Sequence, residues 1–266
     1  MNTPDKFNFE RFGLATRQYF SYNKKQLLGG MLATLGFLTL IAFAIGNHYE
    51  EQYDRCIQNA HYWESPETIY MKTVEIEALA FTCCFFLFTV IAGSLTFSSF
   101  NSKKKRITSL MLPMAKGEMF ILRILIYTVL ANVMFIGCCI AADVLRSILV
   151  FGPNIWTSHA IIFSDRFLSS TLPIILSSAI FGQALYTLGA AMWPRNSFII
   201  TFGVLFAAQL IFIPIIENIT DLFVSIVELL HIDEPLAASL IIFTMAIGVY
   251  WLAWLRFKRY QIILKL

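Results

Sequence analysis

The sequence predicts an all-α, polytopic membrane protein with six transmembrane helices. Hydrophobic residues make up 58% of the 266 residues and charged residues only 14%, against roughly 25% charged in a soluble domain. Apolar stretches of about twenty residues recur, and a helix of that length crosses a bilayer core roughly 30 Å thick while satisfying its own backbone hydrogen bonds. The six predicted spans are Leu27–Ile45, Ala78–Phe97, Ile121–Val144, Phe167–Trp193, Phe198–Ile216 and Leu236–Leu255.

Charge in the connecting segments predicts the orientation, because Lys and Arg in short loops stay preferentially on the cytoplasmic side. Placing the N-terminus in the cytoplasm leaves only a few of the 20 cations outside, namely Arg55, Lys72, Arg146 and Arg166. Both termini are therefore predicted to be cytoplasmic, and the chain to be a multi-pass protein of the inner (cytoplasmic) membrane. The first span lies too deep in the chain for a cleaved signal peptide.

Residues 1–26 are predicted to form a cytoplasmic, interfacial amphipathic helix. Phe9, Phe12, Tyr19 and Phe20 fall near one face, whereas Arg11 and other cations lie mostly off it. This pattern is typical of a helix in the headgroup layer. It is either a functional connecting helix or an ordinary juxtamembrane anchor. Residues 27–266 then form the six-helix transmembrane domain.

Side chains that carry chemistry are sparse. The sequence contains no G-x-x-x-x-G-K-[ST] phosphate loop, no G-x-S-x-G elbow and no H-E-x-x-H pair, so we expect no catalytic residue, bound cofactor or metal in this chain. The adjacent cysteines Cys83–Cys84 and Cys138–Cys139 are interpreted as apolar packing residues. The run from Glu50 to Arg55 fits E-E-x-x-x-R, a pattern of intramembrane proteases, but the histidines which that family also needs are missing.

The fourth predicted span contains small and polar residues at membrane depth. Ser178, Gly182, Gly189 and Ala190 make a strip that a second helix can approach closely. Gln183 and Tyr186 add polar groups, which we expect to bond a neighbouring helix; the alternative is that they line a substrate path.

The segment between the second and third spans is the most informative part of the chain. Four cations, Lys103, Lys104, Lys105 and Arg106, precede an apolar stretch that is broken by Pro113. Apolar residues at helical spacing favour a continuation of the second span beyond the bilayer, and Pro113 should stop any helix near Leu112. A new helix can begin two residues later, with Glu118 in its first turn, where the helix dipole favours an acid.

The stretch LMLPMAKGEMFILRIL resembles the L-P-A-S-x-x-E-K-F-x-x-R signature of six-span permease subunits of ABC exporters, particularly those of Bacteroidetes-type bacteria. The matching positions are Leu112, Pro113, Glu118, Phe120 and Arg123. The resemblance implies that this segment is a coupling helix seated in a groove of an ATPase subunit. The chain is similar to this family in three further predicted features: an interfacial N-terminal helix, six spans with both termini inside, and an outer helix before the last span.

The departures from the signature include its Ser, which is Ala115 here, and its Lys, which is Met119. A serine three residues before Glu118 would complete a capping box, and an alanine cannot. The loss should cost about 1 kcal/mol. Arg123 is expected either to reach the headgroups or to pair with Glu118.

The function implied by the resemblance is that of an exporter subunit working as a homo- or heterodimer with a separate ABC ATPase, on which ATP and Mg²⁺ would bind. The four cations from Lys103 to Arg106 either mark the cytoplasmic side and contact inner-leaflet lipid, or contact the ATPase. The alternatives are a non-transporting membrane scaffold or immunity protein, and an intramembrane enzyme. The residues of the spans do not indicate whether the substrate is a lipid, a drug, a peptide or a glycan.

Overall fold

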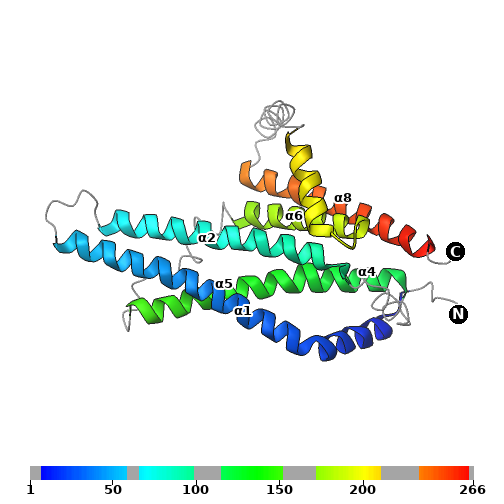
Figure 1. The fold of residues 1–266 in the computed structure, drawn as a ribbon, viewed down its shortest axis with the longest axis horizontal. Coiled ribbons are helices and arrows are strands. Elements are labelled where there is room, and N and C mark those ends of the chain that lie inside the picture. Colours follow the sequence, from blue (N-terminus) through cyan, green and yellow to red (C-terminus); the bar gives the residue numbers. More distant parts are fainter. Residues whose placement is uncertain (1–6, 59–65, 99–114, 152–171, 211–233, 264–266) are drawn as a thin grey trace. The chain divides into compact units, whose positions relative to one another are not determined.

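The computed structural model describes residues 7–58, 66–98, 115–151, 172–210 and 234–263, which are nearly all helical (Figure 1). A further helix, Ser197–Leu210, follows α6. No strand occurs in the described ranges. The labelled elements are α1 (Phe9–Gln58), α2 (Pro66–Leu95), α4 (Lys116–Ile124), the π-helical η2 (Leu125–Leu130), α5 (Ala131–Phe151), α6 (Leu172–Met192) and α8 (Glu234–Ile263).

Five stretches are long and apolar enough to cross a membrane, which makes the chain an all-helical, multi-pass membrane protein. They are Asn23–His48, Glu75–Leu95, Lys116–Arg146, Leu172–Met192 and Leu236–Arg259. These correspond to the first, second, third, fourth and sixth predicted spans. The fifth prediction, Phe198–Ile216, corresponds to the shorter helix Ser197–Leu210, and its last six residues lie outside the described part of the chain.

α1 is one helix of 50 residues that contains residues 9–26 of the predicted interfacial segment and the whole first predicted span. No helix end occurs near residue 26, where we expected the boundary between the two. The physical reason is that no proline interrupts this region, and Gly29 and Gly30 each weaken a helix by only about 1 kcal/mol.

α2 ends earlier than the sequence predicted. It stops at Leu95, and Thr96 and Phe97 form a turn in which the Thr96 amide donates to Gly93 O at 3.2 Å. The predicted helical continuation therefore does not start directly from the span. Its remaining residues, 99–114, lie outside the described ranges.

The chain divides into two compact units, each described here by itself. The first comprises Met1–Ser21, Leu87–Asn132 and Ser170–Leu266, and the second comprises Tyr22–Phe86 and Val133–Ser169. In the first unit α6 and α8 lie side by side (Figure 1).

Aromatic rings form the core of the first unit. The centre of the Phe97 ring lies 5.1 Å from the centre of the Phe257 ring and 6.1 Å from that of Phe120. The ring centres of Trp254 and Phe120 are 5.1 Å apart. Small residues of α6 and α8, such as Ala190, are buried in the same cluster. The cluster therefore joins the turn after α2 to α4, α6 and α8.

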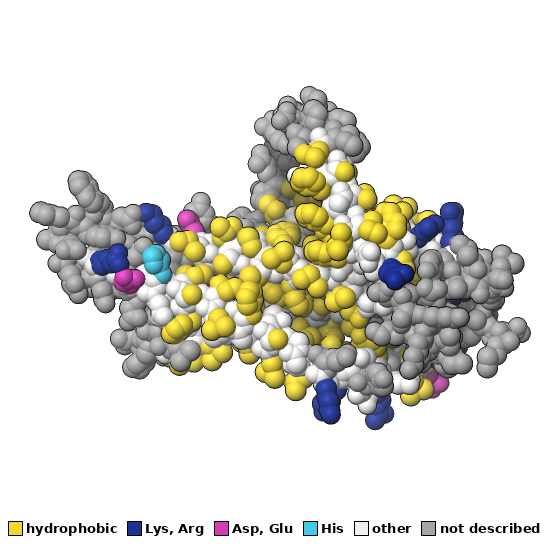
Figure 2. All heavy atoms as spheres, viewed as in Figure 1, with side chains coloured by type: hydrophobic (Ala, Val, Ile, Leu, Met, Phe, Trp, Pro, Cys, Tyr) yellow, Lys and Arg dark blue, Asp and Glu magenta, His cyan; other side chains and the backbone are white. Residues whose placement is uncertain are grey.

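The distribution of polarity is typical of a protein surrounded by lipid. Large apolar side chains are exposed along the helices, among them Leu79, Val133, Ile199 and Trp251, and Figure 2 shows hydrophobic side chains over most of the described part of the face that is drawn. Several polar side chains are instead buried. In a bilayer the apolar exterior meets acyl chains, and the buried polar groups require partners within the protein.

The π-helical turn η2 receives one such partner. The amide nitrogen of Gln183 in α6 donates to Tyr127 O in η2 at 2.6 Å, and its oxygen accepts from Asn132 Nδ2 at 3.2 Å. The hydroxyls of Thr128 and Tyr250 lie 3.1 Å apart. The prediction that Gln183 bonds a neighbouring helix is thus confirmed.

Gly189→Ala should destabilise the first unit. A methyl group at Gly189 would lie 1.8 Å from Thr201 Oγ1 and 2.8 Å from Thr201 Cβ, so the helix Ser197–Leu210 would have to shift. We expect a loss of about 1–3 kcal/mol, seen as a lower unfolding temperature of the purified chain in detergent. Gly182→Ala, on the same helix with nothing within 4 Å, is the matched control and should be neutral or slightly stabilising. Equal losses would show that the clash is not responsible.

Candidate functional site

The helix α4 begins where the sequence predicted a new helix after Pro113. Its N-cap is Ala115, with extended backbone angles (φ −66°, ψ 150°), and Glu118 is the third residue of the helix. Glu118 Oε2 accepts a hydrogen bond from the Ala115 amide at 2.9 Å. The other half of a capping box is missing, because the Ala115 methyl group has no lone pair to accept the Glu118 amide.

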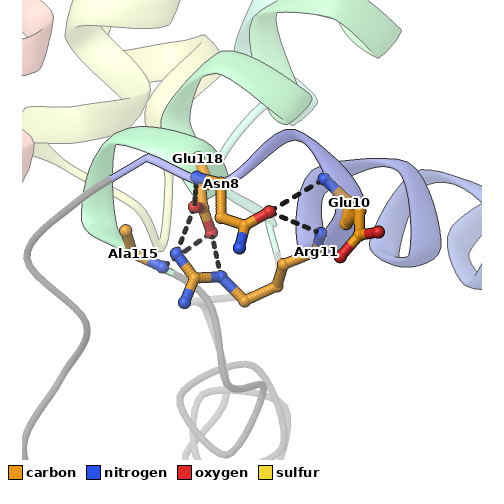
Figure 3. A network of polar contacts seen from close by, with 5 residues as sticks. All are labelled: Asn8, Glu10, Arg11, Ala115 and Glu118. Carbon is orange, nitrogen blue, oxygen red and sulfur yellow. Dashed lines mark hydrogen bonds and ion pairs between the residues drawn. The ribbon is translucent and has the colours of Figure 1, made fainter.

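The same carboxylate also binds the residues that begin α1 (Figure 3). Glu118 Oε1 accepts the Asn8 amide at 2.8 Å, and Oε2 accepts Arg11 Nε at 2.9 Å. Arg11 Nη2 forms an ion pair with Oε1, so the guanidinium and carboxylate groups meet through two parallel contacts. We call Asn8, Arg11, Ala115 and Glu118 the Glu118 junction.

Capping geometry explains why these groups converge. The Asn8 side chain accepts the Glu10 amide at 2.9 Å and the Arg11 amide at 3.5 Å, which makes Asn8 the N-cap of α1. Its own amide is thereby left free to donate to Glu118. One carboxylate thus lies at the N-termini of two helices, where both helix dipoles favour negative charge.

Burial strengthens this ion pair. Glu118 has no exposed surface, while the Arg11 side chain is 24% exposed. The hydrogen bond to Glu118 raises the pKa of Arg11 above its ordinary value, so the guanidinium remains charged at any physiological pH. Because four N–H groups converge on the buried carboxylate, its burial is compensated.

The first helix also packs along α4 and η2 beyond the junction. Phe12, Ala15 and Tyr19 lie against Leu122 and Ile126. Burial together with the neighbouring Tyr127 hydroxyl, 3.5 Å away, raises the pKa of the Tyr19 phenol. Part of the face predicted to sink into the headgroup layer is therefore a protein contact.

The other aromatics of that predicted face behave differently. Phe9 is 82% exposed and Phe20 is also exposed, so neither packs into the core of the first unit. These two rings remain available for lipid.

Arg123 does not have the ion-pair partner that the sequence suggested. Glu118 is held by Arg11, whereas Arg123 Nη1 donates to Thr96 O at 2.9 Å and its guanidinium lies 5.7 Å from the centre of the Phe97 ring. Thr96 directly follows the end of α2, where a cation satisfies the last carbonyl groups. Of the two alternatives for Arg123, the pair with Glu118 is not formed, because the guanidinium extends to the end of α2. Contact with the headgroups stays a prediction.

Among the remaining predicted site residues, only Phe120 is described. It is buried in the aromatic cluster, stacked near Phe97 and Phe257, and so has a packing role in the first unit. Leu112, Pro113 and the four cations Lys103, Lys104, Lys105 and Arg106 lie outside the described residues.

Sequence reasoning missed Asn8, Arg11 and Thr96. An asparagine just before an amphipathic helix is a recognisable N-cap signal, so Asn8 could have been found. The pairing of Arg11 with Glu118 spans 107 positions and leaves no local pattern. Thr96 acts through its backbone carbonyl, which its side chain does not reveal.

The described residues contain no group of three or more His, Cys, Asp or Glu side chains placed to hold a metal ion. Comparison of the chain with protein-family models, with curated proteins and with solved structures gives no match.

Neutralising the charges of Arg11 and Glu118 should show that the two side chains stabilise the fold as a pair. Arg11→Gln and Glu118→Gln should each lower the unfolding temperature, because each leaves a charged partner without its counter-charge. The double variant should lose less than the sum of the two single variants. Arg17→Gln and Glu10→Gln, exposed neighbours on the same helix, are the matched controls and should change little. Strict additivity would contradict the pairing.

Ala115→Ser should complete the capping box and stabilise the start of α4. The serine hydroxyl would accept the Glu118 amide while the existing contact from Glu118 to the residue 115 amide stays in place. A gain of about 1 kcal/mol is expected, measurable by thermal or denaturant unfolding. Ala115→Val adds bulk without an acceptor and should give no gain; an equal gain would exclude capping as the cause.

Proposed function

We propose that this chain is the membrane-spanning permease subunit of an ABC exporter, working as a dimer with two copies of a separately encoded ATPase. The observation that carries the proposal is the position of Glu118, the glutamate of the L-P-x-x-x-x-E string. It lies in the first turn of an apolar helix directly after residues 99–114, and it binds the beginning of α1.

The contacts of α4 suggest how motion would spread from the coupling segment. A displacement of residues 99–114 acts directly on α4, which continues into η2 and α5. Glu118 transmits it to the start of α1, and Arg123 to the end of α2. Phe120 transmits it to α8 through Trp254 and Phe257.

In this proposal, closure of the ATPases on nucleotide moves the segment from Leu95 to Glu118 as a lever. Tilting of the second and third spans then alternates access to a central path. ATP and Mg²⁺ bind to the partner ATPase, and this chain supplies the mechanical connection and the path. The outward direction of transport follows from the family resemblance.

The proposed orientation places the Glu118 junction at the cytoplasmic face of the inner membrane. Support comes from the distribution of cations: Lys116, Arg123, Arg195, Arg256 and Lys258 belong to the same unit as the junction. With both termini inside, the start of α1 and the basic end of α8 are on the side where an ATPase would bind.

The test is co-purification with an ABC ATPase encoded beside this chain, followed by ATP hydrolysis in lipid nanodiscs. We expect the wild-type complex to form, and Glu118→Gln and Pro113→Ala to lower the stimulated hydrolysis several-fold, because α4 would no longer follow the coupling segment. Glu10→Gln is the matched control and should retain wild-type hydrolysis.

A second variant separates the two interpretations of the cations. Replacing Lys103, Lys104, Lys105 and Arg106 with Gln should abolish association if they contact the ATPase, and should alter membrane orientation if they only mark the cytoplasmic side. If the wild-type chain binds no ATPase, the exporter assignment fails and a scaffold or immunity protein is favoured.

A further inference from the structure

A buried cluster of charged residues lies in the second unit, independent of the Glu118 junction. Glu77 of α2 is 1% exposed, and Asp143 and Arg146 of α5 are 1% and 4% exposed. Arg146 Nη2 donates to Asp143 Oδ1 at 2.7 Å, and Arg146 Nη1 lies 2.9 Å from Glu77 Oε2. Two carboxylates thus share one guanidinium near the ends of two helices that are long and apolar enough to cross a membrane, Glu75–Leu95 and Lys116–Arg146.

The two carboxylates are not held equally. Asp143 is one helical turn before Arg146 and receives a well-formed hydrogen bond from it. Neither oxygen of Glu77 accepts a hydrogen bond from a described residue, although one of them is close to the guanidinium. The guanidinium therefore hydrogen-bonds chiefly to Asp143, and Glu77 is a buried carboxyl group that lies near Arg146 but accepts no hydrogen bond from the described part of the chain.

An ionised carboxylate in that position is unfavourable. Burial of a charge without hydrogen bonds costs several kcal/mol even after relaxation, and such a group usually takes up a proton instead. Two acids that share one cation repel each other, which favours protonation of the less well held acid. The neutral carboxyl group removes both penalties, while Asp143 and Arg146 remain a compensated pair.

We propose that Glu77 is a proton-binding site: the folded chain holds Glu77 as the neutral carboxylic acid, and loss of that proton loosens the packing of α2 against α5 within the second unit. Among the described residues, the charged groups that act on Glu77 are Arg146 and Asp143, both on α5. α1 carries no charged residue between Lys25 and His48, and Glu75, on α2 itself, is exposed.

The experiment is infrared spectroscopy of the full-length chain in lipid nanodiscs at neutral pH. A protonated carboxyl group absorbs separately from carboxylates. We expect a carboxylic-acid band that exchanges slowly in heavy water, disappears in Glu77→Gln and persists in the matched control Glu75→Gln. In Glu77→Asp, which retains an acid if the glutamine variant fails to fold, the band should shift in frequency.

A second measurement follows the unfolding temperature against pH. Because the folded state favours the protonated form, the wild-type chain should lose stability as pH rises through the titration of Glu77, whereas Glu77→Gln should show a flatter dependence and a higher unfolding temperature at alkaline pH. The absence of the band from the wild-type chain at neutral pH would overturn the proposal. So would an unfolding temperature that rises with sodium concentration but not with acidity, since the ligand would then be a metal cation.

Discussion

The carboxylate of Glu118 is the interaction on which the arrangement of the first unit depends. It accepts N–H groups from the N-cap residues of two helices, Asn8 before α1 and Ala115 before α4, and it neutralises Arg11. A single buried charge thereby supports the Asn8 cap of α1 and supplies half of a capping box at α4. Residues distant in sequence are brought together because both helix starts require an anion at the same point.

α4 extends this connection in two further directions within the same unit. Arg123 satisfies a carbonyl at the end of α2, and Phe120 enters the aromatic cluster with α8. One short helix therefore contacts the start of α1, the turn after α2 and α8 through an acid, a base and a ring. Each contact uses different chemistry, so each can be altered by substitution without removing the other two.

The two buried acid sites respond to burial in opposite ways. Glu118 is surrounded by N–H donors and remains an anion that organises the first unit. Glu77 in the second unit meets only part of a guanidinium already bonded to Asp143. In our proposal this difference in N–H donors among the described residues decides whether each acid keeps its charge.

Local sequence determined the all-helical membrane class, the approximate spans, and the start of α4 with Glu118 in its first turn, because hydropathy, proline chemistry and helix-end preferences act over a few residues. The turn after Leu95 and the partners of Glu118 and Arg123 were decided by tertiary structure. Those features depend on which helix ends meet. Buried donors and acceptors must then be satisfied by groups that no sequence spacing reveals.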